Sequence, residues 1–128
     1  MNEKVVEMNR IAITSEGPSL DDLVDPRFGR AAGFLVVDLD TMDTQYIDNG
    51  QSQVMAQGAG IQATELVARA GVGWLLTGFV GPKAFTALSA AGIKIGQNLE
   101  GLTVREAVER FKGGRIETAQ APNREAGR

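Results

Sequence analysis

The chain of 128 residues contains no cysteine and no histidine. These absences exclude a disulfide framework, Cys/His zinc sites, iron–sulfur ligation by protein thiolates, a cysteine nucleophile and a Ser–His catalytic triad. Aromatic residues make up only 5% of the chain, whereas glycine occupies 16 positions. We therefore expect a core of Val, Ile, Leu and Ala, and a chain that makes many tight turns.

Positive charge is also scarce, because 13 Lys and Arg residues face 16 Asp and Glu residues, for a net charge of −3. Nucleic acids and anionic membranes require clustered Lys and Arg, so neither is an expected partner. No apolar run reaches the roughly 18–20 residues of a membrane span. Residues 1–10 are polar and carry no apolar signal-peptide region, which predicts a cytoplasmic protein.

Hydrophobic periodicity and the positions of Gly and Pro predict the secondary structure. The expected strands are residues 10–15, 34–38, 44–48, 74–77 and 93–95, and the expected helices are residues 61–70, 82–91 and 102–111. A short turn joins the second and third strands into an antiparallel hairpin. Helices alternate with the later strands, which predicts parallel crossovers. The order β-β-β-α-β-α-β-α indicates a single α/β domain with a mixed five-stranded sheet and three main helices.

The chain length fits one domain. We expect residues 1–9 to be an N-terminal extension and residues 10–118 to form the folded domain. Residues 119–128 are polar, contain Pro and Gly, and are predicted to be a disordered tail. Residues 49–60, rich in Gly, Gln, Ser and Ala, form a long irregular stretch of the kind that is usually functional or mobile.

One edge of the predicted sheet is a candidate binding site, because ligands of open α/β sheets bind beyond the carboxyl ends of parallel strands. These ends fall at Ser15, at Thr77 and Gly78, and at residues 96–98. Gly58 and Gly60 lie where the irregular stretch enters a helix, and helix N-termini offer unpaired N–H groups with partial positive charge. Hydroxyls and backbone donors at one edge favour an anionic ligand.

The segment DPRFGR, which begins at Asp25, is the densest local signal. Arg27 and Arg30 flank a Phe28–Gly29 turn, and their guanidinium groups can present several donors to an oxyanion or a sulfide. An alternative interpretation stays open, in which Asp25 and Arg27 form a salt bridge within the turn and Phe28 fills the core.

Two further features have ordinary structural explanations beside functional ones. Met55 offers a thioether to a soft metal, or it only fills a gap. Acidic residues gather around the hairpin at Asp38, Asp40, Asp43 and Asp48. A metal-dependent nuclease needs paired carboxylates on buried strands, and the first strand carries none, so these residues fit turn chemistry better.

Three motifs, in order along the chain, carry a family resemblance. DPRFGRA at residues 25–31, GAGIQATELVARAGV at residues 58–72 and LLTGFVGPKAFTALSAAGIKI at residues 75–95 resemble the dinitrogenase iron–molybdenum cofactor biosynthesis family. The resemblance extends from about residue 9 to residue 118. It implies a ribonuclease-H-like α/β fold and a small protein that carries a metal–sulfur cluster or its precursor.

Within that family, a chain with Arg27 and without His or Cys is most similar to the orange-protein subgroup. This resemblance implies a molybdenum–copper sulfide cluster held without covalent protein ligands; an iron–molybdenum cofactor precursor is the second possible cargo. Such a cluster is anionic and brings its own sulfide ligands, so it requires backbone N–H groups, hydroxyls, Arg and apolar walls rather than thiolates.

The predicted function is therefore a non-catalytic cluster carrier, with no catalytic residue and no protein metal ligand. The expected cluster-binding residues are Ser15, Arg27, Phe28, Gly29, Arg30, Met55, Gly58, Gly60, Thr77 and Gly78. A cluster-receiving or assembly protein is the expected macromolecular partner. The alternative is a metal-free partner-binding or regulatory module that uses the acidic hairpin and residues 49–60 as its contact surface, and a hydrolase or nuclease is the third hypothesis.

Overall fold

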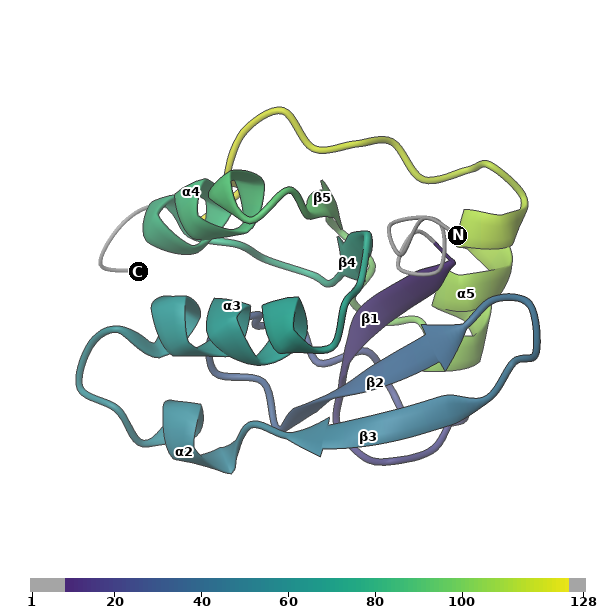
Figure 1. The fold of residues 1–128 in the computed structure, drawn as a ribbon, viewed down its shortest axis with the longest axis horizontal. Helices are drawn as coiled ribbons and strands as arrows, with labels where there is room; N and C mark the ends of the chain where they lie inside the picture. Colours follow the sequence, from purple (N-terminus) through teal and green to yellow (C-terminus); the bar gives the residue numbers. More distant parts are fainter. Residues whose placement is uncertain (1–8, 125–128) are drawn as a thin grey trace.

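Five strands form one mixed sheet in the order β3-β2-β1-β4-β5 in the computed structural model, which describes residues 9–124 (Figure 1). The strands are β1 Arg10–Ser15, β2 Gly33–Asp38, β3 Thr44–Asp48, β4 Trp74–Leu76 and β5 Lys94–Gly96. β2 runs antiparallel to β1 and β3, whereas β4 runs parallel to β1 and β5. The carboxyl ends of β1, β3, β4 and β5 therefore share one edge.

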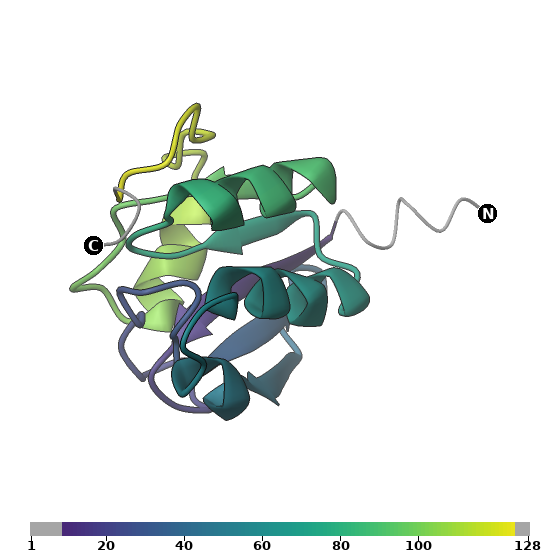
Figure 2. The ribbon, with the colours of Figure 1, turned by 90° about the vertical axis from the view of Figure 1, so that its left-hand side faces the viewer.

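Helices cover both faces of this sheet, as Figures 1 and 2 show. The helices are α2 Gly50–Gln53, α3 Ala59–Arg69, α4 Pro82–Ala90 and α5 Val104–Lys112. α3 and α4 lie side by side on one face, and α5 packs against the other. α2 is a single turn inside the stretch predicted to be irregular. α5 begins with a capping box, in which Thr103 and Glu106 bond reciprocally.

The core is divided between the two faces, because successive side chains of a strand point to opposite sides. On β1, Ala12 packs in the cluster that includes Val67 of α3, whereas Ile11 and Ile13 pack in the cluster that includes Val108 of α5. Each of these side chains is almost fully buried. Burial of an aliphatic side chain contributes about 1.5–3 kcal/mol, so the two clusters hold the sheet edge in a fixed position.

The structure confirms the predicted fold class, a single α/β domain with a mixed five-stranded sheet. The tail differs from the prediction, because the Ala119 N–H donates to the Ile95 carbonyl (2.8 Å) and Asn123 bonds to the chain near Val80. Residues 119–124 are thus held in place, while residues 1–8 and 125–128 lie outside the described part of the chain. Within the described residues, no helix is both long enough and apolar enough to cross a membrane.

Candidate functional site

The predicted edge is where β1 and β4 continue into loops, and it faces the viewer in Figure 2. The Thr14 and Thr77 hydroxyl oxygens lie 2.9 Å apart, and the Thr14 hydroxyl also lies 2.7 Å from the Asp25 carbonyl oxygen. A hydroxyl has one proton, so Thr14 donates to Asp25 while Thr77 donates to Thr14. These bonds join the ends of both strands to the loop that begins at Asp25.

Asp25, which is buried, organises that loop through its carboxylate. One carboxylate oxygen accepts from the Arg27 N–H and the other from the Ala32 N–H, each at 3.1 Å. The ring of Phe28 is buried and lies 5.8 Å from that of Phe34. The loop is therefore fixed at both ends by a carboxylate and in the middle by a core side chain.

The loop pairs with the turn between β4 and α4. The Phe79 N–H donates to the Pro26 carbonyl (2.6 Å), and the Phe28 N–H donates to the Phe79 carbonyl (3.2 Å). A Cβ atom placed on Gly78 would lie 2.6 Å from the Pro26 carbonyl oxygen. Glycine at position 78 is thus what permits the two backbones to approach so closely.

The same loop also meets the start of α3. A Cβ atom on Gly29 would lie 3.0 Å from the Gly60 nitrogen, and one on Gly60 would lie 2.8 Å from the Ala84 Cβ. The first turns of α3 and α4 are therefore adjacent to each other and to the loop. Among residues 9–124, no side chain caps either of these helix starts, in contrast to α5. Their first N–H groups have no partner within the helix and point to this junction.

The two arginines differ in their contacts. The Arg27 side chain is 54% exposed, and its Nε lies 3.6 Å from an Asp25 carboxylate oxygen, which leaves its terminal nitrogens available. Arg30 donates from Nη1 to the Gln53 carbonyl (3.1 Å), and the Gln53 amide donates back to the Arg30 carbonyl (3.2 Å). The alternative interpretation is correct about the Asp25–Arg27 salt bridge and the buried Phe28. Even so, the Arg27 side chain stays exposed, so both interpretations of this segment hold together.

The structure places the expected binding residues in two groups. The loop–helix junction brings together Arg27, Gly29, Gly60 and Gly78, while Arg30, Met55 and Gly58 lie around the α2–α3 connection. The side chains of Ser15, Phe28 and Thr77 are buried and serve the fold, since the Ser15 hydroxyl donates to the Gly17 carbonyl. Within residues 9–124, no group of three or more Asp or Glu residues is arranged to hold a metal ion.

Sequence reasoning missed Asn49, whose side chain binds the backbone of the loop that carries Arg27. This residue is 1% exposed, and its Nδ2 donates to the carbonyls of Gly29 (3.2 Å) and Ala31 (3.0 Å). Within the described part of the chain, its Oδ1 and the Ser52 hydroxyl are buried without a partner. Asn49 directly follows β3, which runs parallel to β1, and this position in the sequence is the signal that would have placed it at the candidate edge.

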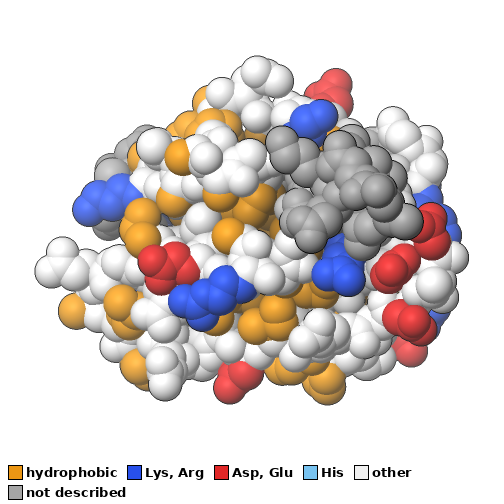
Figure 3. Space-filling view, in the orientation of Figure 1, with side chains coloured by type: hydrophobic (Ala, Val, Ile, Leu, Met, Phe, Trp, Pro, Cys, Tyr) orange, Lys and Arg blue, Asp and Glu red, His pale blue; other side chains and the backbone are white. Residues whose placement is uncertain are grey.

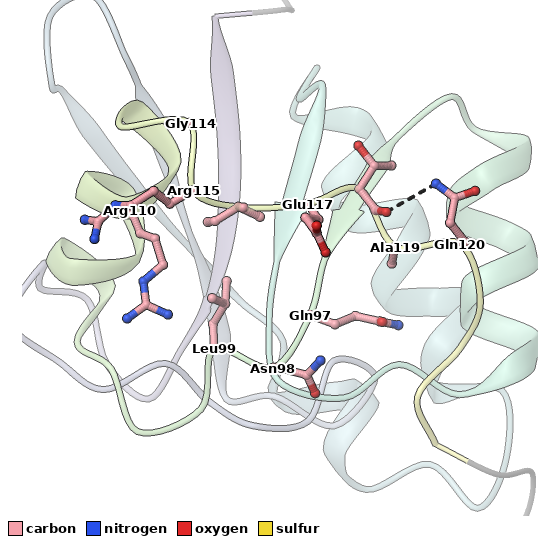
Figure 4. Close-up of a pocket in the computed structure, with 11 residues that line it drawn as sticks. Gln97, Asn98, Leu99, Arg110, Gly114, Arg115, Glu117, Ala119 and Gln120 are labelled. Atoms are coloured by element: carbon pink, nitrogen blue, oxygen red, sulfur yellow. Dashed lines mark hydrogen bonds between the residues drawn. The ribbon is translucent and has the colours of Figure 1, made fainter.

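A separate cavity of about 670 Å³ lies beside the end of β5 (Figure 4). Residues 97–99, the end of α5 and the segment that follows α5 form its walls. Arg110, Arg115 and Glu117 supply its charged groups, and Gln97, Asn98 and Gln120 supply amides. The Arg115 side chain folds back toward Gly113, at the end of α5. None of the residues predicted to bind a cluster lines this cavity.

Comparisons with known proteins identify relatives over most of the chain. A family model for the dinitrogenase iron–molybdenum cofactor matches residues 8–114. The apo form of the orange protein from Desulfovibrio gigas is 64% identical, with a TM-score of 0.90 over 91% of this chain and 98% of that one. A putative NifB protein from Thermotoga, of the DUF35 family, is 35% identical, with a TM-score of 0.79 over 91% and 98% of the two chains.

A curated relative is more distant. An uncharacterized protein of Methanocaldococcus jannaschii is 25% identical over 115 residues, which are 88% of this chain and 92% of that protein. The motifs at the loop, at the start of α3 and at the start of α4 all lie inside the region that the family model matches. Because that match spans most of the chain, the protein belongs to the dinitrogenase iron–molybdenum cofactor family.

Proposed function

We propose that this protein is a non-catalytic carrier of an anionic metal–sulfur cluster in the cytoplasm. The preferred cargo is a molybdenum–copper sulfide cluster, and an iron–molybdenum cofactor precursor is the second. The observation that carries the proposal is the junction at which the loop of Arg27 meets the first turns of α3 and α4. Two helix starts without side-chain caps and one exposed guanidinium converge there.

The donor chemistry of the junction suits such a cargo. A cluster that arrives with its own sulfide ligands needs hydrogen-bond donors and positive potential, and a chain without Cys or His supplies no thiolate or imidazole. Helix N-termini provide both, and a guanidinium adds several N–H groups. The relationship to the orange protein supports the proposal, because the structure of that relative is of an apo form.

Exposed apolar side chains at the start of α3 and at the neighbouring α2–α3 connection favour retention of a cluster. Ile61, in the first turn of α3, is 43% exposed, and Val54, at the end of α2, is 84% exposed. Figure 3 shows that hydrophobic side chains are also exposed on the adjoining face, which α3 and α4 form. An apolar rim excludes water from sulfide bridges and slows their hydrolysis.

Reconstitution tests the proposal. Metal-free protein is mixed with tetrathiomolybdate and a copper salt, passed through gel filtration, and analysed for molybdenum, copper and visible absorbance. The double variant Arg27→Ala/Arg30→Ala is expected to retain the cargo about tenfold less well, because it loses two guanidinium groups. Arg69→Ala/Arg105→Ala, which removes equal charge from exposed positions of α3 and α5, serves as the matched control. A wild-type protein that elutes without molybdenum contradicts the proposal.

The exposed Val54 and Ile61 also favour a contact with another protein. Under the carrier proposal, this partner is a cluster-receiving or assembly protein; under the alternative, the chain is a metal-free regulatory module. Pull-down experiments separate the two. A carrier is expected to bind its partner differently with and without cluster, whereas a partner held equally by metal-free protein and by Arg27→Ala/Arg30→Ala favours the regulatory module.

A further inference from the structure

The segment from Arg115 to Arg124, here named the C-terminal strap, crosses the edge strand β5 and returns to the candidate site. Ile116 packs over Gly96, where a Cβ atom would lie 2.6 Å from the Ile116 methyl carbon. Farther along, the Gln97 side chain donates to the Ala121 carbonyl (3.1 Å). The strap is therefore attached to β5 and to the loop that follows it.

Asn123 binds the turn that joins β4 to α4. Its Oδ1 accepts from the Val80 N–H (2.7 Å), its Nδ2 donates to the Gly78 carbonyl (2.8 Å), and its own N–H donates to the Val80 carbonyl (3.1 Å). The Nδ2 group also donates to Asn98 Oδ1 (3.0 Å). One carboxamide thus satisfies a donor and an acceptor of the same turn, which fixes its conformation.

This turn is shared with the candidate site. Between Gly78 and Val80 lies Phe79, whose backbone bonds on its other side to Pro26 and Phe28. The strap, the turn and the loop that carries Arg27 are consequently joined by a continuous series of hydrogen bonds. A substitution of Asn123 is therefore expected to weaken hydrogen bonds not only in the turn but also in the loop that carries Arg27.

The strap also brings a second guanidinium to the site. The Arg124 guanidinium carbon lies 4.6 Å from the centre of the Phe79 ring, within the range of a cation–π contact. Arg27 and Phe79 form a parallel β-bridge, and side chains of residues directly opposite in a bridge lie on the same face. Arg27 and Arg124 therefore lie on the same side as the Phe79 ring.

We propose that the C-terminal strap is part of the binding site, with Asn123 as a positioning residue and Arg124 as a second cation for the anion that Arg27 meets. The proposal rests on the carrier function proposed above. The family model ends at residue 114, so nothing in the family match assigns a role to these residues. The ligand class is an anionic sulfide cluster, bound by two guanidinium groups, one of which the Phe79 ring holds in place.

Hydrogen exchange tests the positioning role without any cargo. In metal-free Asn123→Ala, the Val80 amide loses its acceptor and is expected to exchange about tenfold faster by NMR, with smaller changes at Phe79 and Phe28. Gln120→Ala is the matched control, since its amide donates to the Thr118 carbonyl within the strap. Unchanged Val80 exchange in Asn123→Ala overturns the positioning role.

Cargo retention tests the role of Arg124. Reconstituted with tetrathiomolybdate and copper, Arg124→Ala is expected to bind about fivefold more weakly and with a smaller salt dependence, while Arg124→Lys recovers part of the loss. Arg115→Ala removes the same charge at the other end of the strap, where the side chain folds toward Gly113, and is expected to match wild type.

The outcomes separate this proposal from the carrier function. If Arg27→Ala weakens retention but Arg124→Ala behaves as Arg115→Ala does, the binding role of Arg124 is overturned and the carrier function stands. If wild-type protein retains no cluster, the carrier function fails and the binding role of Arg124 fails with it. The exchange measurement on Asn123→Ala decides the positioning role in either case.

Discussion

Substitution of Gly78 by Ala is the most informative test of how the site is built. The added methyl group would lie 2.6 Å from the Pro26 carbonyl oxygen and 2.9 Å from the Pro26 Cα. Both are backbone atoms, so no rotation of a side chain relieves the overlap. The loop has to move away from the turn between β4 and α4, or both backbones have to distort.

The loss of unfolding free energy is estimated from the contacts that such a movement breaks. Separation of the backbones weakens the Phe79 N–H bond to Pro26 and the Phe28 N–H bond to Phe79, each with a net value of about 1 kcal/mol. Strain from overpacking adds about 1–3 kcal/mol. We expect Gly78→Ala to lose about 3 kcal/mol of unfolding free energy, or roughly 10 °C in Tm for a domain of this size.

Gly81→Ala provides the control for this experiment. A Cβ atom on Gly81 has no neighbour within 4 Å, and the residue has an ordinary φ of −79°. The unfolding free energy of Gly81→Ala is expected to stay within about 0.5 kcal/mol of wild type. Alanine is a slightly poorer residue than glycine at the start of a helix, but it also makes the unfolded chain less flexible, and the two effects offset each other. Urea denaturation followed by circular dichroism measures both variants. A Gly78→Ala protein as stable as Gly81→Ala refutes the claim that close backbone contact builds the site.

Two further substitutions test the loop and the helix cap. Asp25→Ala removes the acceptor of the Arg27 N–H and is expected to lower the free energy of unfolding, measured by urea denaturation, by about 3 kcal/mol. The control Asp40→Ala, at the exposed hairpin, is expected to change it by less than about 0.5 kcal/mol. Equal effects of the two substitutions would contradict the role assigned to Asp25. The pKa of Glu106 is lowered because its carboxylate accepts from the Thr103 backbone N–H and hydroxyl. This stabilisation is present above the ordinary carboxyl pKa of 4.5 and is lost as pH falls through the lowered pKa, so Glu106→Gln is expected to flatten the fall of Tm as pH decreases below about 4.5; an unchanged slope in that range would count against it.

The order of strands and helices could be predicted because local pattern determines it. Alternating apolar residues mark β1, and Pro82 and Gly92 bracket α4. The short helix α2 could not be predicted, since a single turn of four residues shows no helical periodicity and has no side-chain cap. Its place depends on tertiary contacts, above all those of Asn49 beneath the loop.

The tail shows where composition misleads. The composition of residues 119–128, which include Pro122, is typical of disorder, yet Asn123 is held by Val80, a partner 43 positions away in the sequence. No local pattern records such a pairing. The edge at which the strands end could be predicted, because parallel strands bring their carboxyl ends together whatever the distant contacts of the chain.

The direction of side chains at that edge was not predictable, and this limits what residue type alone says about a site. Ser15 and Thr77 offer hydroxyls in the sequence, but the structure uses both for internal hydrogen bonds. What remains at the junction is mainly backbone, brought close by Gly29, Gly60 and Gly78. Under the proposed carrier function, a site made of N–H groups and helix dipoles would select its ligand by charge and size rather than through a covalent metal ligand. Substitution of an arginine should therefore tune the affinity for an anionic cluster, whereas a methyl group on Gly78 should remove the site itself.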